Sequence, residues 1–162
     1  FALGAVIAHE FLHSIIMSRS TYVSQIYTKE KACIEKYYNK TCVEAAGTCN
    51  SGVHTFDEDA ADIEGLKLIY KIFEDEFKDD LKKFVYPDNN ITNEQQFFYA
   101  FASMWCFDIS NHTDRTHSRE DIRINGAYRQ MAQFARAFSC PADSAMTIPE
   151  HERCHLFAPG SN

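Results

Sequence analysis

Residues 9–13 read His9-Glu10-Phe11-Leu12-His13, an H-E-x-x-H pattern within an apolar run at the start of the chain. On a helix, residues four apart lie on the same face, so both imidazoles can bind one Zn²⁺. Glu10 lies beside them and can reach a water on the metal. Zinc lowers the pKa of such a water from about 15.7 towards 7, and a carboxylate can then remove its proton as the water attacks a carbonyl. The alternative is a chance match on an ordinary buried helix, because five-residue patterns recur in unrelated chains.

The composition bounds the class of protein. A chain of 162 residues fits one domain or part of a larger one. With 45% hydrophobic and 14% aromatic residues, it lies outside the disordered class. The formal charge of −7, with no basic stripe to neutralise phosphates, argues against a nucleic-acid partner. The longest uninterrupted apolar run is far shorter than the roughly 20 residues of a membrane-spanning helix, so no span is expected.

Cysteines and glycosylation sequons both indicate an oxidising compartment. The chain has six cysteines with no close C-x-x-C spacing, which argues against a structural zinc ribbon. Three N-x-S/T sequons favour a secreted protein or the ectodomain of a membrane protein, and the candidate glycosylation sites are Asn39, Asn90 and Asn111. The chain opens in an apolar helix without an initiator Met, and we therefore expect a targeting segment upstream.

Apolar residues recur at helical spacing along most of the chain, which predicts a mainly α protein. Helices are expected over residues 1–17, 20–38, 57–84, 92–106 and 125–138, in a domain that covers residues 1–157 and is followed by a tail at 158–162. Thr92 can cap the helix that follows it. Residues 39–52 are rich in turn formers and read as a loop, in which Cys42 and Cys49 could close a local disulfide. No hairpin is expected.

A zinc helix with two histidines needs a third protein ligand, and Glu58 is the candidate. We expect it at the opening of the second strongly periodic helix, with Asp62 one turn later on the same face. Asp62 can then accept the N–H group of a ligating histidine while Glu58 faces the metal. The alternative is helix capping, because Thr55 and Glu58 match a capping box and acidic residues are common in a first turn.

Several longer motifs follow the H-E-x-x-H in a fixed order. They are Glu58-Asp59-Ala60-Ala61-Asp62 with Gly65-Leu66 and Tyr70, residues 97–106 (FFYAFASMWC), His117-Ser118 with Arg123 and Asn125-Gly126, residues 134–140 with Phe134, Ala137, Phe138 and Cys140, and Ser144, Met146, Pro149 and Cys154. Together they resemble the neprilysin and endothelin-converting-enzyme family of zinc metallopeptidases, in the C-terminal part of the catalytic domain. The resemblance covers nearly the whole chain.

The resemblance implies a role for each matching residue. His9, His13 and Glu58 would bind one zinc ion per chain, and Glu10 would be the general base. Asp62 would hold a zinc histidine, His117 would stabilise the oxyanion and Arg123 would hold a substrate carbonyl. From the residues alone, His117 in a polar segment reads as a solvated histidine. The remaining histidines have no such support and are expected at the surface: His54, His112, His151 and His155.

The resemblance also implies the covalent framework. Cys33 would pair with Cys154, while Cys106 and Cys140 would pair with cysteines in an upstream part of the same polypeptide. The chain departs from the family pattern where two glycines and an asparagine usually stand, and the residues there add negative charge near the metal: Asp57, Asp59 and Glu64. Arg119 replaces a proline. None of these changes removes a ligand or the base.

The expected fold is therefore mainly α, the C-terminal helical portion of a thermolysin-like (gluzincin) zinc metallopeptidase lobe. The expected activity is zinc-dependent endopeptidase cleavage of short peptides, in an extracellular or cell-surface protein. One alternative is an inactive ectodomain of the same family that serves in binding or structure. Another is a disulfide-rich helical interaction module with an accidental H-E-x-x-H. The oligomeric state stays open.

Overall fold

The computed structural model describes residues 2–16, 21–39, 42–43, 48–85, 90–106 and 115–157. Its elements, in chain order, are α1 (Ala2–Ile16), α2 (Thr21–Asn39), β1 (Cys42–Val43), β2 (Thr48–Cys49), α3 (Gly52–Glu76), α4 (Asn93–Ser103), α5 (Glu120–Arg129), α6 (Ala132–Ala137) and the 3₁₀ turn η2 (Glu150–Glu152). The predicted mainly α class is confirmed. None of the described helices has the length and apolar content needed to cross a bilayer. The predicted tail at 158–162 lies outside the described residues.

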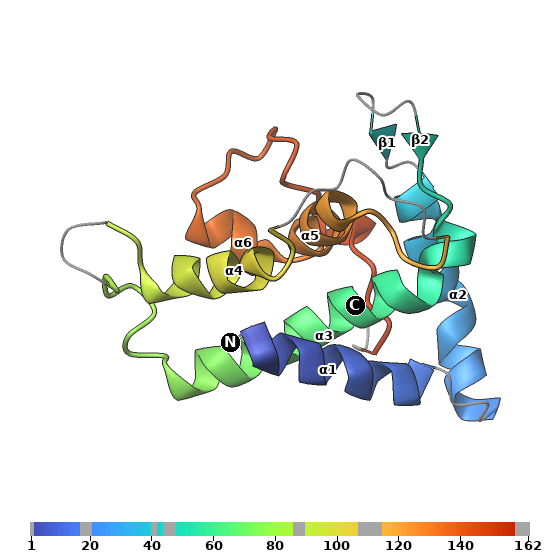
Figure 1. Ribbon diagram of the computed structural model, residues 1–162, viewed down its shortest axis with the longest axis horizontal. Coiled ribbons are helices and arrows are strands. Elements are labelled where there is room, and N and C mark those ends of the chain that lie inside the picture. The colour runs from blue at the N-terminus through green and yellow to red at the C-terminus, as the bar shows by residue number, and fades with distance from the viewer. Residues whose placement is uncertain are drawn as a thin grey trace.

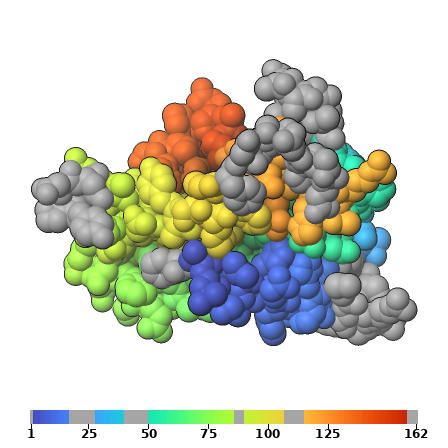
Figure 2. Space-filling view, in the orientation of Figure 1, coloured from blue at the N-terminus to red at the C-terminus, as the bar shows by residue number. Residues whose placement is uncertain are grey.

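Two helices, α1 and α3, form the frame of the molecule and lie side by side (Figure 1). They run antiparallel, since Gly4 lies against Ile69 while His9 lies against Gly65. A Cβ atom on Gly65 would come within 3.0 Å of the backbone nitrogen of His9. Only a glycine therefore lets the two backbones approach this closely. In the space-filling view, α1 lies next to the α4 segment on the face shown (Figure 2).

The helix α2 packs against α3. Two further contacts hold it in place, one with the start of α3 and one with the C-terminal segment of the chain. The side-chain Oδ1 of Asn39 accepts a 2.8 Å hydrogen bond from the backbone N–H of Gly52, at the start of α3. A disulfide joins Cys33 to Cys154 with a Cα–Cα distance of 5.7 Å, as predicted. This bond closes a loop of 121 residues and ties α2 to the end of the described chain.

An aromatic core joins the second half of α3 to α4, α5 and α6. Phe97 stacks on Phe73, and Phe98 stacks on Tyr70, with ring centroids 5.0 and 5.7 Å apart. The predicted cap of α4 is confirmed: the Thr92 hydroxyl accepts from the Gln95 N–H, and the Gln95 side chain accepts from the Thr92 N–H. This packing holds α4 beside α1 and so forms one wall of the cleft described below.

Three details of the predicted elements are wrong. The helix predicted at 57–84 begins at Gly52, because Ser51 occupies its N-cap position and Gly52 fits closely against the Glu35 carbonyl. The same helix ends at Glu76, where Phe77 leaves helical geometry. The predicted helix at 125–138 is two helices, α5 and α6. They are separated where Met131 is extended and the Gln130 side chain accepts the N–H of Cys154.

The segment expected to be a plain loop contains a short antiparallel hairpin. In it, β1 pairs with β2, and Cys42 lies opposite Cys49 in the backbone register. The side chains of these two cysteines lie outside the described part of the structure. A local disulfide between them therefore stays a prediction.

Candidate active site

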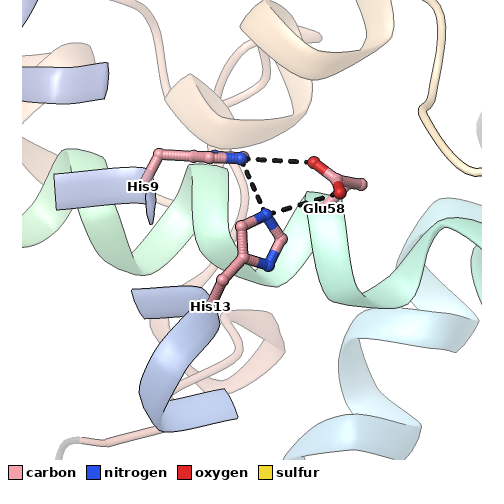
Figure 3. Close-up of side chains that lie close together, drawn as sticks. All are labelled: His9, His13 and Glu58. Carbon is pink, nitrogen blue, oxygen red and sulfur yellow. Dashed lines mark hydrogen bonds and ion pairs between the residues drawn. The ribbon is translucent and has the colours of Figure 1, made fainter. Parts of the chain in front are cut away.

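Two helices bring together three side chains that could hold a metal ion (Figure 3). His9 and His13 lie one turn apart on α1 and point toward Glu58 on α3. The Nε2 atoms of the two histidines are 2.9 Å apart. Glu58 offers one carboxylate oxygen to each: Oε2 lies 3.2 Å from His9 Nε2, and Oε1 lies 3.4 Å from His13 Nε2.

These spacings fit a zinc ion. Zinc–nitrogen and zinc–oxygen bonds of about 2.0–2.2 Å place two ligands of a tetrahedral ion about 3.3 Å apart. The three donor atoms all lie within 4.8 Å of one another, and each residue is half-buried. Two neutral imidazoles and one carboxylate are also the ligand types of a catalytic zinc site, which leaves a position open. Among the residues that the structure describes, this is the one cluster that could hold a metal.

Behind these donors, Asp62 fixes His9. Its Oδ1 atom lies 2.9 Å from Nδ1 of His9, on the opposite side of the imidazole from the metal-facing Nε2. Such a carboxylate fixes the tautomer and orientation of a ligating histidine. Asp62 also accepts two hydrogen bonds from Arg123, from Nε at 2.6 Å and from Nη2 at 2.9 Å. The guanidinium of Arg123 lies over the Trp105 ring, 4.2 Å from its centroid.

One cleft joins these residues with the expected general base. Glu10 is exposed at its edge, and both His117 and Arg123 line it. His117 Nε2 lies 3.0 Å from Glu58 Oε2, so this imidazole is next to the three residues that could hold a metal. Apolar side chains from α1 and the α4 region form the rest of the wall: Ala5, Val6, Phe101, Met104 and Trp105.

The neighbouring charges shift the pKa values of His9, Asp62 and Glu58. Burial alone would lower the pKa of His9, but its contacts with Asp62 and Glu58 raise it to about 9. Burial alone would raise the pKa of Asp62 and of Glu58. The contact of His9 with both carboxylates and the guanidinium of Arg123 beside Asp62 outweigh that effect, and both pKa values are lowered. The pocket therefore has two anionic carboxylates that favour a bound cation.

The structure brings together all seven residues predicted for the site: His9, Glu10, His13, Glu58, Asp62, His117 and Arg123. The capping alternative for Glu58 is wrong. Because α3 begins at Gly52, Glu58 lies in the second turn, and Thr55 lies inside the helix. The Thr55 hydroxyl donates to Asp59 Oδ2 at 2.6 Å instead of capping an N–H group.

None of the other described residues singled out in the sequence contributes a donor atom to the cluster. His54 and His151 are exposed, and His155 is half-buried beside Glu150. Cys106 is exposed and Cys140 half-buried, and within the described residues both are free thiols. Asn39 and Asn90 are exposed. Asn111 and His112 lie outside the described residues.

The roles of the buried residues next to Glu58 were not predicted from the sequence. Asp59 was identified only as an added negative charge, yet it is fully buried and accepts hydrogen bonds from Thr55 and Ser118. Burial raises the pKa of Asp59 to about 7 against the opposing effect of those two hydrogen bonds. Glu64, another added acid, accepts from Lys67 Nζ at 2.9 Å, and Asp57 is exposed. The signal for Asp59 was its position beside Glu58, but its partners come from distant segments.

Comparison with known proteins agrees with this arrangement. The model of Peptidase family M13 matches residues 2–154. The chain is 30% identical to human endothelin-converting enzyme-like 1 in an alignment of 170 positions that covers 93% of the chain and 21% of that protein. It is 27% identical to bovine endothelin-converting enzyme 1, over 96% of the chain and 22% of that protein. The chain thus spans about a fifth of the length of the curated relatives it matches.

A solved structure has the same fold. It is the zinc metalloprotease Zmp1 of Mycobacterium tuberculosis in complex with an inhibitor, with a TM-score of 0.74 at 17% identity, over 94% of this chain and 26% of that one. The resemblance inferred from the motifs is confirmed, and so is the thermolysin-like fold class. Because the family model covers residues 2–154, nearly the whole sequence, the chain belongs to peptidase family M13.

Proposed function

We propose that this chain supplies the metal-binding half of a zinc endopeptidase active site that cleaves short peptides. The observation that carries the proposal is the antiparallel contact of α1 with α3. It brings the donor atoms of His9, His13 and Glu58 within 4.8 Å of one another, beside a cleft that His9 and Glu10 both line. Zinc bound there would supply Lewis acidity, polarising a substrate carbonyl and making a water more acidic.

The side chains of the cleft divide the remaining chemistry. The carboxylate of Glu10 takes the proton of the attacking water and passes it to the leaving amine. The imidazole of His117 donates to the oxygen that becomes negative as the peptide carbonyl is attacked. Arg123 uses two of its five N–H groups on Asp62, and other N–H groups of the guanidinium can hold a second substrate carbonyl.

Substrate binding follows from the walls of the cleft. Phe101, Met104 and Trp105 give the cleft an apolar lining, and Arg123 and His117 supply hydrogen-bond donors to it. Such a cleft suits an extended peptide, because it buries a side chain and satisfies backbone carbonyls at once. We propose peptides as the substrate class and an upstream part of the same polypeptide as the partner that completes the site. Cys106 and Cys140 would pair there.

The location proposed for the protein is extracellular or at the cell surface. The chain has a disulfide between Cys33 and Cys154. Disulfides persist in oxidising compartments and are rare in cytosolic proteins. Asn39 and Asn90 are both exposed, as glycosylation requires. A mass shift on enzymatic deglycosylation of the protein from a secretory host supports this location. Absence of glycan at both asparagines would argue against it.

The experiment that tests the activity compares the full-length protein with its Glu10→Gln variant on a quenched fluorescent peptide library. The proposal predicts chelator-sensitive cleavage by the wild type and a loss of about 10²-fold or more in the variant, with unchanged zinc content. Asp57→Asn is the matched control, because it removes an exposed acid next to Glu58 and should keep activity within about twofold. A folded, zinc-loaded wild type that cleaves nothing would instead support the inactive ectodomain.

A further inference from the structure

A closed set of hydrogen bonds lies directly behind the zinc-binding glutamate. Asp59 follows Glu58 on α3 and is 0% exposed. Its two carboxylate oxygens accept from two hydroxyls: Oδ2 from Thr55 Oγ1 and Oδ1 from Ser118 Oγ, each at 2.6 Å. Thr55 lies one turn earlier on the same helix, whereas Ser118 comes from the segment that precedes α5. Asp59 thus joins two parts of the chain that are 59 residues apart.

Asn50 donates to both hydroxyls of this set. Its amide nitrogen donates to Ser118 Oγ at 2.8 Å and to Thr55 Oγ1 at 3.1 Å. Since each hydroxyl accepts from the amide, its own hydrogen is free to point at the carboxylate. The amide nitrogen supplies donors and the carboxylate supplies acceptors, so this arrangement satisfies all four groups. The Thr55 hydroxyl also lies 3.2 Å from the backbone carbonyl of Ser51. Ser118 is 1% exposed and held on two sides.

The residue before Ser118 is His117, and the residue before Asp59 is Glu58. Two parallel contacts therefore tie the segment to α3: His117 to Glu58 at 3.0 Å and Ser118 to Asp59 at 2.6 Å. The His117 side chain is 36% exposed, whereas Ser118 is buried, so the buried contact is the rigid one. Consecutive Cα atoms are about 3.8 Å apart, and a shift of Ser118 must move the imidazole of His117.

We propose that Asp59 is a positioning residue that holds His117 in place through the Ser118 hydroxyl. The inference rests on the proposed function, in which His117 donates to the developing oxyanion. A donor of this kind acts only when it is preorganised, and a misplacement of about 1 Å can cost on the order of 10²-fold in rate. Asp59 touches neither the substrate nor the metal site's donor atoms, and it acts on the reaction only through its neighbour.

Two variants separate positioning from simple stability. Ser118→Ala removes the hydrogen bond between Asp59 and the neighbour of His117, and Thr55→Val removes the hydrogen bond on the other oxygen of Asp59. Each variant therefore removes one hydroxyl from the same carboxylate. In the full-length, zinc-loaded protein, we expect Ser118→Ala to lower kcat by about 10-fold to 10²-fold with KM within about twofold. The loss of kcat in Thr55→Val should be at least about fivefold smaller than the loss in Ser118→Ala, although both variants lower the melting temperature. Asp59→Asn keeps an acceptor for one hydroxyl and should fall between them.

The decisive measurement repeats Ser118→Ala in a His117→Ala background. If Asp59 acts through His117, the second substitution causes no further loss in kcat, whereas an independent structural effect would lower kcat by the same factor in both backgrounds and overturn the proposal. Equal losses in Thr55→Val and Ser118→Ala would also overturn it. Hydrogen exchange gives a readout without turnover: Ser118→Ala should speed exchange at residues 115–119, and unchanged exchange would contradict the proposal. A wild type with no hydrolysis would contradict the proposed function itself. That outcome is distinct from a wild type that hydrolyses peptides while Ser118→Ala and Thr55→Val lose equal kcat, which would contradict only the role of Asp59.

Discussion

Nδ1 of His9 lies 2.9 Å from Oδ1 of Asp62, and this contact connects the helix that carries the two proposed zinc histidines to the helix that carries the proposed third ligand. Asp62 is 3% exposed and is bound from its other side by Arg123. The orientation of His9 is therefore set by a buried carboxylate that is itself fixed. Its Nε2 atom is left to face Glu58.

This contact predicts that Asp62→Asn weakens zinc binding. Residues that orient a metal-ligating histidine typically contribute 10–100-fold to affinity, and we expect a loss in that range, measured by competition with a chromogenic chelator. Asp57→Asn serves as the control, since it removes an equal charge from an exposed position on the same helix. Equal affinities in Asp62→Asn and the wild type would mean that the contact does not support the metal site.

The close approach of α1 and α3 predicts opposite results for two glycines. At Gly65 an added Cβ would meet the backbone of His9 at 3.0 Å, and backbone cannot move without separating the helices. Gly65→Ala should therefore lower the free energy of unfolding by about 1–3 kcal/mol and weaken zinc binding.

Gly4→Ala is the matched control on α1. There the added Cβ would meet only the end of the Ile69 side chain, which can rotate away. Because alanine is a better helix former than glycine, this change should be neutral or stabilising by up to about 1 kcal/mol. The two free energies are compared by denaturant unfolding. If both variants lose the same stability, the close approach at Gly65 is not what positions His9.

A buried glutamate outside the site predicts how stability depends on pH. Burial alone would raise the pKa of Glu94, but hydrogen bonds from Lys82, Tyr70 and Arg136 outweigh it and hold that pKa below its ordinary value of 4.5. A lowered folded-state pKa adds stability above the unfolded-state value, and this stability is lost as the pH falls through the folded-state pKa. The free energy of unfolding should therefore decrease as the pH falls below about 4.5.

The variant Glu94→Gln tests this assignment. It should reduce that pH dependence and destabilise the protein by about 2 kcal/mol at pH 7, as expected for lost hydrogen bonds to a charged group. Glu74→Gln is the control, because Glu74 also pairs with Arg136 but is 32% exposed, and surface pairs contribute about 0–1 kcal/mol. An unchanged acid profile in Glu94→Gln would assign the pH dependence to other carboxylates.

The Cys33–Cys154 disulfide predicts a large loss of stability on its removal. It joins cysteines 121 residues apart. A disulfide of this span reduces the conformational entropy of the unfolded chain and so stabilises the folded state by several kcal/mol. Replacing both cysteines by serine should lower the melting temperature and cost about 2–5 kcal/mol. Peptide mapping without reduction should find the Cys33–Cys154 cross-link in the wild type. A cross-link between other cysteines would contradict the structure.

The cluster that could hold a metal was predictable from the sequence because its residues follow local rules. Residues four apart on a helix share a face, so His9 and His13 could be paired from spacing alone, and Asp62 followed Glu58 by the same rule. The start of α3 could not be predicted, since Asn50, Ser51 and Gly52 are turn formers whose N-cap role depends on contact with α2.

The supporting contacts were beyond sequence reasoning for a different reason. The bond between Asp59 and Ser118 joins residues 59 apart, and no pattern in either segment indicates the other. The break between α5 and α6 depends on Gln130, whose side chain accepts an N–H group from Cys154 near the chain's end. Such contacts are set by tertiary packing, which overrides local helix preference.

The most direct test of the central claim is the zinc coordination of the full-length protein, measured by metal analysis and X-ray absorption at the zinc edge. We predict one zinc ion per chain with two imidazole nitrogens and one carboxylate oxygen from the protein, and loss of that coordination in Glu58→Ala. A folded protein that binds no zinc, or one whose zinc coordination is unchanged in Glu58→Ala, would contradict it.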